Sequence, residues 1–123
     1  MSLHDPCPVR NRPQVHAAVR SLLARMNIEV IEPPLHGARS VCCGDSFYPA
    51  LPPGQIEEKM RLRAASMPCQ DVAVTCVSCI KAMAAGGKTP RHLMDLLYGD
   101  PTPPGNCDVA AWHGRLDAYI AAH

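Results

Sequence analysis

Aromatic residues are scarce in this chain, which has one Trp, three Tyr and one Phe among 123 residues. Proteins that bind single-stranded nucleic acid stack its bases on aromatic side chains, so the chain lacks that means of binding. Charge of one sign is lacking as well, because 12 Lys and Arg residues are balanced by 11 Asp and Glu residues. A net charge of +1 creates no general field for nucleic acid, a membrane surface or acidic substrates. We therefore predict no nucleic-acid partner.

Long apolar runs are also missing. No stretch approaches the roughly 20 apolar residues that cross a bilayer, and the opening MSLHDPCPVR lacks the apolar centre of a signal peptide. We expect a cytoplasmic chain without a transmembrane segment. Residues 1–3 are interpreted as an appended leader, because the HDPC that follows looks like a strand end running into a turn. The chain is accordingly expected to be part of a longer protein.

Cysteine, by contrast, is abundant, with seven residues in the chain. An odd number cannot pair completely, and a reducing cytoplasm keeps most thiols free. The composition therefore favours metal or redox chemistry over a disulfide framework.

Hydrophobic periodicity and capping residues predict alternating helices and short strands. The predicted helices cover residues 13–26, 55–66, 79–85, 89–98 and 108–121. The predicted strands are rich in β-branched residues and cover residues 28–31 and 71–75. In the helix at 55–66, Ile56 and Met60 are expected to face the core while Arg63 faces solvent. Leu97 in the fourth helix, and Tyr119 and Ile120 in the last, are expected to face the core.

This alternation indicates an α/β fold. We predict a single layered domain with a short, mostly parallel sheet flanked by helices, in a Rossmann-like arrangement. The predicted boundaries are 4–99 for a cysteine-rich domain, 100–107 for a proline-rich linker and 108–123 for a C-terminal helix.

Five of the seven cysteines lie where an extended segment is expected to pass into a loop or a helix. These five are Cys7, Cys42, Cys43, Cys76 and Cys79. The turns that follow parallel strands gather at the carboxyl edge of a sheet, so the five sulfur atoms can converge there. The start of a helix at Cys76 and Cys79 also offers free N–H groups that favour the thiolate, which is the form that binds metals.

Each motif alone has more than one interpretation. The CxxC spacing of residues 76–79 serves zinc, iron–sulfur and thiol-exchange sites alike. Adjacent Cys42 and Cys43 can supply two ligands from one tight loop with the small Gly44 behind them, or can be two small buried apolar residues. Cys69 and Cys107 lie outside the pattern and are expected to take no part.

The number of cysteines adds a further indication. Four thiolates satisfy tetrahedral zinc or an ordinary cubane, so a fifth indicates a larger or irregular cluster, or a thiol left free for redox exchange. No histidine is expected to be a ligand, because most are scattered without ligand spacing and His4 is expected to lie in a turn or in the core.

The order and separation of these cysteines resemble the cysteine-rich CCG domain family. Here 34 residues separate Cys7 from the CCG motif at 42–44, and 32 residues separate Cys43 from the CVSC motif at 76–79. The likeness extends over residues 4–98, including HDPC at the start, VTCVSC in the middle and HLMDLL near the end. The family includes the cysteine-rich subunit of heterodisulfide reductase and the iron–sulfur subunits of glycolate, lactate and anaerobic glycerol-3-phosphate oxidising systems.

The resemblance implies electron transfer, and disulfide reduction in some members, through a non-cubane four-iron four-sulfur cluster. The implied ligands are Cys7, the Cys42–Cys43 doublet and the Cys76–Cys79 pair. Gly44 is implied to lie at the cofactor. The implied partners are a second CCG domain or flavin and iron–sulfur subunits, through which the protein would attach peripherally to a membrane. Other family members bind zinc or use the domain without disulfide chemistry.

The chain departs from the family pattern in two ways. Asp45 and Ser46 follow the CCG motif where many relatives have glycine, so the loop backbone is expected to approach a cluster differently. Only one copy of the domain is present, whereas heterodisulfide reductase members usually have two. This favours a fragment or subunit that is one half of a two-copy protein.

Three hypotheses of function follow. The first is a CCG domain of an iron–sulfur oxidoreductase subunit. The second is a zinc-stabilised structural or interaction module without turnover. The third is a metal-free thiol oxidoreductase that uses Cys76 and Cys79, and it leaves the Cys42–Cys43 doublet without a role.

Overall fold

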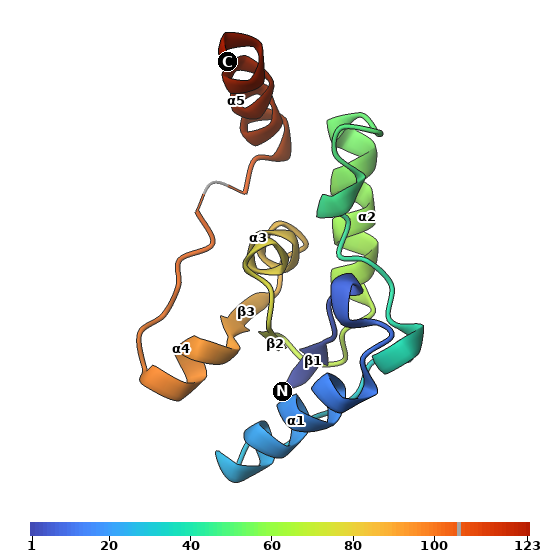
Figure 1. Cartoon of the computed structure of the whole chain (residues 1–123), viewed down its shortest axis with the longest axis vertical. Coiled ribbons are helices and arrows are strands. Elements are labelled where there is room, and N and C mark those ends of the chain that lie inside the picture. Colours follow the sequence, from blue (N-terminus) through green and yellow to red (C-terminus); the bar gives the residue numbers. More distant parts are fainter. Residues whose placement is uncertain (106) are drawn as a thin grey trace.

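A three-stranded parallel sheet organises this α/β fold, which a computed structural model describes for residues 1–105 and 107–123. Its strands are β1 (Ser2–His4), β2 (Asp71–Val74) and β3 (Thr89–His92), in the order β1-β2-β3. Both pairs of neighbouring strands run parallel, with β2 in the centre (Figure 1). The prediction of an α/β domain with a short parallel sheet and flanking helices is confirmed.

Five α-helices and three short 3₁₀ turns complete the described chain. The helices are α1 (Pro13–Arg25), α2 (Pro53–Ala65), α3 (Val77–Ala85), α4 (Leu93–Tyr98) and α5 (Val109–Ala122). The 3₁₀ turns are η1 (Cys7–Val9), η2 (Gly37–Arg39) and η3 (Asp45–Phe47). Proline at the first turn begins both α1 and α2, where its missing N–H costs nothing.

Side chains alternate between the two faces of the sheet along each strand. Both faces therefore carry apolar side chains, and helices cover both. Val72 and Val74 of β2 point to one face and pack in a core with α2 and α3. Ala73 points to the other face and packs with Leu3 of β1 and Leu23 of α1. Fully burying a valine or leucine side chain contributes about 1.5–3 kcal/mol, so these two cores hold the layers together.

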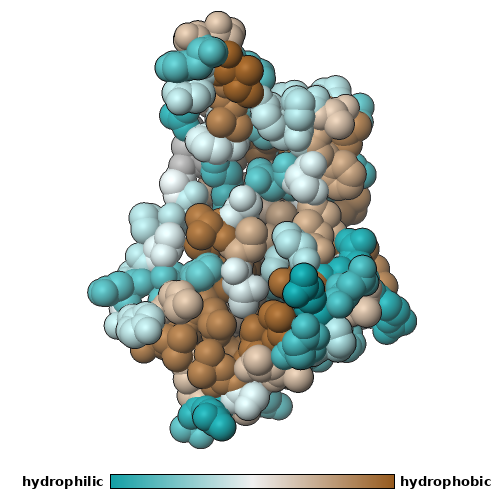
Figure 2. Space-filling view, in the orientation of Figure 1, coloured by the Kyte–Doolittle hydropathy of each residue, from teal (hydrophilic) through white to brown (hydrophobic). Residues whose placement is uncertain are grey.

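The second core is only partly covered. Leu93 and Leu96 of α4 pack against it but keep part of their surface exposed. Figure 2 shows apolar side chains gathered on the surface between α1 and α4. Leu97, expected in the core, is 38% exposed, so that prediction is wrong.

The strand predicted at residues 28–31 forms only a single bridge, between Ile31 and Ser2 of β1. The ladder cannot extend past this bridge, because β1 is three residues long and Pro33 has no N–H to donate. The short strand β1 itself contains residues that were interpreted as a leader. Ser2 and Leu3 are 0% and 1% exposed, so both residues pack in the core of the sheet.

The helix predicted from Thr89 is also wrong in its first turn, which is strand β3. The Thr89 N–H donates to the Gln70 carbonyl, and the strand then pairs with β2 at the sheet edge, where Pro90 is tolerated. Helix α4 begins only at Leu93, where the His92 side chain accepts from the Met94 amide. Pairing with a neighbouring strand outweighed the local capping signal.

The C-terminal helix α5 forms as predicted in position and packs against α2. Val109 is 2% exposed and joins the core beside α2 and α3, and the ring of His113 contacts that of Tyr48 in a tilted arrangement with 4.5 Å between centroids. Tyr119 and Ile120 are more than 60% exposed, so their predicted inward placement is wrong. In the predicted linker at 100–107, residue 106 lies outside the described residues.

Candidate metal centre

One cavity brings together the five cysteines that the sequence singled out. Its volume is about 240 Å³. It lies where the segments after β1 and β2 meet the long segment between α1 and α2, here called the central loop. The cysteines that line it are Cys7, Cys42, Cys43, Cys76 and Cys79. The expected convergence of these side chains at the end of a parallel sheet is therefore what the fold produces.

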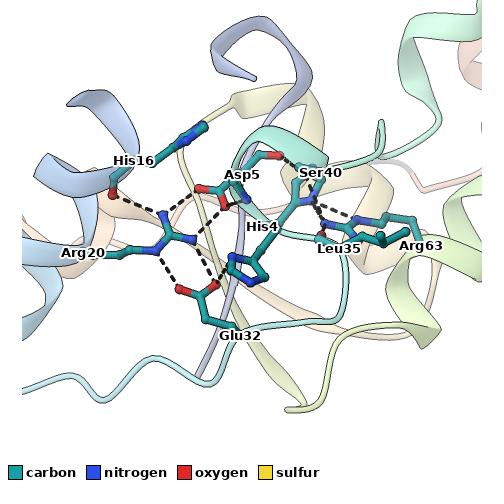
Figure 3. Close-up of polar contacts among 10 residues, drawn as sticks. His4, Asp5, His16, Arg20, Glu32, Leu35, Ser40 and Arg63 are labelled. Atoms are coloured by element: carbon teal, nitrogen blue, oxygen red, sulfur yellow. Dashed lines mark hydrogen bonds and ion pairs between the residues drawn. The ribbon is translucent and has the colours of Figure 1, made fainter. Parts of the chain in front are cut away.

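Cys7 approaches the cavity from η1, directly after β1, and an ion-pair cluster fixes the turn between them. Arg20 of α1 donates to both carboxylate oxygens of Asp5, at 3.0 and 2.8 Å, and to both of Glu32, at 2.6 and 2.9 Å (Figure 3). The Gly37 amide donates to Asp5 at 2.7 Å. Burial raises the pKa of Asp5, but hydrogen bonds from Arg20 and Gly37 outweigh it and leave that pKa below its ordinary value.

The part of the central loop that contains Cys42 and Cys43, here called the doublet loop, brings Cys42 close to Cys7. The two Sγ atoms lie 4.0 Å apart, and Cys42 Sγ also accepts from the Gly44 amide at 3.3 Å. Ser46 places its Oγ atom 2.8 Å from the same sulfur. Cys42 is therefore surrounded by hydrogen-bonding groups from its own loop.

Gly44 places this loop directly on α2. Its φ of +115° lies in the left-handed region that favours glycine. A Cβ atom there would lie 3.0 Å from the backbone nitrogen of Met60 and 3.3 Å from the carbonyl of Ile56. The glycine therefore permits a close approach between loop and helix, and its amide reaches Cys42.

Cys43 and Cys79 form the buried floor of the site. They are 4% and 3% exposed and belong to the core that also contains Ile56 and Met60. Cys79 lies in the first turn of α3, and Cys76 is its N-cap residue, so the CxxC pair straddles a helix start as predicted. A buried core role and a place in the cavity thus coexist for the same two thiols.

His4 lies beside these two buried thiols. A ring nitrogen of His4 and the sulfur atoms of Cys43 and Cys79 all lie within 4.8 Å of one another. The sequence pattern predicted a turn or core position for His4 but did not bring it to the site. The only signal available was its position at the end of an extended segment, three residues before Cys7.

Arg63 is the second neighbour of the site that the sequence pattern did not reveal. It was expected on the solvent face of α2, but it is only 3% exposed, so that prediction is wrong. Its guanidinium donates to His4 Nδ1 at 3.2 Å, to the Leu35 carbonyl at 3.0 Å and to Ser40 Oγ at 3.3 Å (Figure 3). These acceptors pull the side chain inward, which periodicity along the helix cannot reveal.

Neighbouring thiols change one another's pKa values. Hydrogen bonding to Cys43 and burial raise the pKa of Cys42 to about 12. For Cys43, hydrogen bonding with Cys42 lowers the pKa, but Cys79 and burial raise it to about 12. Burial and the neighbouring Cys42 likewise raise the pKa of Cys7. Several negative thiolates so close together need a positive centre, which a bound metal would provide.

The other candidate groups differ from this site. Cys69 and Cys107 do not line the cavity, in agreement with their predicted exclusion. Asp5, Glu32 and His36 also lie close enough to hold a metal ion, but the guanidinium of Arg20 already binds all four carboxylate oxygens. That cluster is explained as a structural ion pair.

Comparisons with protein-family models, with curated proteins and with solved structures found no significant match to this chain. The resemblance to CCG domains therefore stays an expectation from the sequence. Within the described residues, no helix is both long and apolar enough to cross a membrane. The cysteine cluster has the donor chemistry to hold a metal ion, because thiolates are ligands for zinc and for iron–sulfur clusters alike.

Proposed function

We propose that the chain is a CCG-type domain of an iron–sulfur oxidoreductase subunit, which passes electrons through a cluster held by Cys7, Cys42, Cys43, Cys76 and Cys79. The observation that carries this proposal is the lining of one cavity by all five thiols. The cavity volume of about 240 Å³ far exceeds the roughly 15 Å³ that a single water needs, so it has room for more than one small ion.

The donor set also favours a cluster over one metal ion. Tetrahedral zinc uses four ligands, and the fifth thiol would then have no role. A cluster would supply one-electron redox chemistry at a potential set by the thiolates and by hydrogen bonds to sulfur. The residues around it would supply those hydrogen bonds, as Gly44 and Ser46 already do for Cys42.

The finer expectations from the sequence belong to the same proposal. The order β1-β2-β3, with helices in the crossovers, is compatible with a Rossmann-like arrangement. We further propose a cytoplasmic protein that works with a second CCG domain or with flavin and iron–sulfur subunits, and attaches to membranes only through them. Disulfide reduction is the reaction that this site would carry out in a heterodisulfide reductase-like assembly.

Anaerobic reconstitution with ferrous iron and sulfide tests the proposal. We expect bound iron and sulfide in the wild-type chain, with visible absorption, and loss of both in Cys42→Ser. The matched control is Cys69→Ser, because Cys69 is a cysteine outside the cavity. A wild-type chain that takes up no iron under these conditions would contradict the proposal.

The same thiols keep the zinc alternative open, because any four of them satisfy a structural zinc site. Stoichiometric zinc that iron does not replace, and unfolding on chelation, would favour that function. The metal-free exchange hypothesis predicts instead that Cys79→Ser traps a mixed disulfide with a thiol substrate while Cys42→Ser changes little.

A further inference from the structure

A buried positive charge lies under the cysteine site without a carboxylate partner. Arg63 is 3% exposed, and among residues 1–105 and 107–123 no carboxylate oxygen lies within 4.0 Å of its guanidinium nitrogens. Its hydrogen-bond acceptors are all neutral oxygens or the His4 ring. An isolated buried cation is costly, so a negative charge is expected nearby. The Asp5 carboxylate acts on Arg63 from beyond ion-pair distance, and the thiols Cys43, Cys79 and Cys42 of the cavity are the next groups whose negative charge would act on it.

The contact with Arg63 decides which nitrogen of His4 carries the proton. A guanidinium has N–H donors and no acceptor, so His4 Nδ1 must accept from it. A ring nitrogen that accepts a hydrogen bond carries no proton, so the His4 ring in this arrangement is neutral. A neutral ring with an accepting Nδ1 carries its proton on Nε2.

The Nε2–H group has no other partner. Nε2 is buried, and no hydrogen-bond partner for it exists among the described residues. The sulfur atoms of Cys43 and Cys79 both lie within 4.8 Å of a His4 ring nitrogen. Because a metal-bound nitrogen cannot keep its proton, this tautomer also makes His4 a donor and not a ligand.

We propose that Arg63 and His4 form a positioning pair in which Arg63 holds His4 so that its Nε2–H donates to the sulfur of Cys43 or Cys79 and stabilises negative charge there. The pair connects the buried charge on α2 to the floor of the cavity through the end of β1. With a cluster bound by the cysteines, this hydrogen bond would favour the reduced form of the cluster, because that form carries more negative charge. This inference rests on the proposed function only for the nature of the occupant, since the hydrogen bond acts on the thiolates themselves.

The first test is made on the reduced, metal-free chain, so that its outcome does not depend on iron uptake. Two-bond ¹H–¹⁵N NMR at neutral pH identifies the protonated nitrogen of each histidine. We expect the His4 proton on Nε2, protected from exchange and shifted in Cys43→Ala or Cys79→Ala. A proton on Nδ1, or a resonance that neither cysteine substitution moves, would overturn the proposal.

The second test measures thiolate character from the rate of alkylation by iodoacetamide at one neutral pH, with Cys69 as internal reference. A hydrogen bond to a charged group changes an equilibrium by roughly tenfold or more, so Arg63→Met and His4→Phe should slow alkylation of Cys43 and Cys79 by about that factor. A purely structural role predicts the opposite sign, because a loosened core exposes these thiols and speeds the reaction.

Two further variants keep this second test decisive. His4→Gln retains an oxygen to accept from Arg63 and an N–H to donate to sulfur, so its alkylation rates should stay close to wild type. Arg61→Met is the matched control on the exposed side of α2, where Arg61 pairs only with Glu58, and it should change nothing. Unchanged or faster alkylation in both Arg63→Met and His4→Phe would refute the pair.

Discussion

The sulfur atoms of Cys7 and Cys42 lie 4.0 Å apart, although 34 residues separate them along the chain. A disulfide requires about 2.05 Å between sulfurs, so the pair is unbonded but within easy reach of one. Both side chains keep part of their surface exposed, whereas Cys43 and Cys79 are buried. The short distance and the partial exposure together make Cys7 and Cys42 a pair that can form a disulfide when no metal is bound.

We therefore predict that oxidised glutathione converts the metal-free chain first to a form with a Cys7–Cys42 disulfide. The two thiols lose two protons and two electrons, and glutathione takes up the electrons. Peptide mass mapping after alkylation identifies the bridge, and reductant should restore the capacity to bind metal. A first bridge that involves Cys69 or Cys107 would contradict the predicted order.

Gly44→Ala should destabilise the fold by about 2–3 kcal/mol, because it adds left-handed backbone strain and a Cβ atom against the backbone of α2. Urea unfolding of the metal-free chain measures this. Gly54→Ala is the control, since no atom lies within 4 Å of its added Cβ and its φ is not in the left-handed region. Equal midpoints for the two variants would show that the close packing of the doublet loop on α2 is unimportant.

Arg20→Met should cost about 2–3 kcal/mol, because it leaves the carboxylate of Asp5 buried without its cation. The cost is less than for a fully buried pair, since the Arg20 side chain is 26% exposed. Adding Asp5→Asn to the variant should recover part of the loss in urea unfolding. Arg61→Met breaks an exposed pair and should leave the midpoint unchanged, so equal effects of Arg20→Met and Arg61→Met would refute the role of this cluster.

Cys43→Ser should destabilise the metal-free chain by about 1–3 kcal/mol, because it places a hydroxyl in an apolar core. Cys69→Ser, outside that core, should have a much smaller effect on urea unfolding. The two substitutions are chemically identical, so the difference between them reports the environment. Similar midpoints would mean that Cys43 contributes little to packing.

Asp95 should hold the start of the linker in a pH-dependent way. Its carboxylate accepts from the Thr102 hydroxyl at 2.6 Å and amide at 3.0 Å, and these bonds lower the pKa of Asp95 below its ordinary value. With a lowered folded-state pKa, the contact is present above the ordinary value and is lost as pH falls through the lowered one. The Thr102 amide shift in NMR should follow that titration, and in Asp95→Asn it should not.

Much of the framework was predictable from local sequence signals. The run of β-branched residues in β2 and the helical periodicity of apolar residues in α1 and α2 are local properties of these segments. The structure contains the three elements where they were expected. The convergence of the cysteines followed from parallel topology, since the ends of parallel strands share an edge. Each of these inferences needed only one segment or one general rule.

The errors have a common physical origin, which is dependence on a distant partner. β3 replaced a helical turn because Thr89 bonds to the backbone of Gln70, and Arg63 turned inward because β1 and the central loop offer acceptors. His4 gained its place beside the buried thiols in the same way. None of these contacts leaves a periodic signal in the chain.

Cys43 and Cys79 each belong to the hydrophobic core and to the cysteine cavity at once. Selection on such positions acts for two reasons that one substitution cannot separate. A descendant that gave up the chemistry would still need small, polarizable side chains there to keep β2, α2 and α3 together. The persistence of cysteine at these two positions in a set of diverging sequences would therefore say little about activity, whereas its persistence at the more exposed Cys7 and Cys42 would say a great deal.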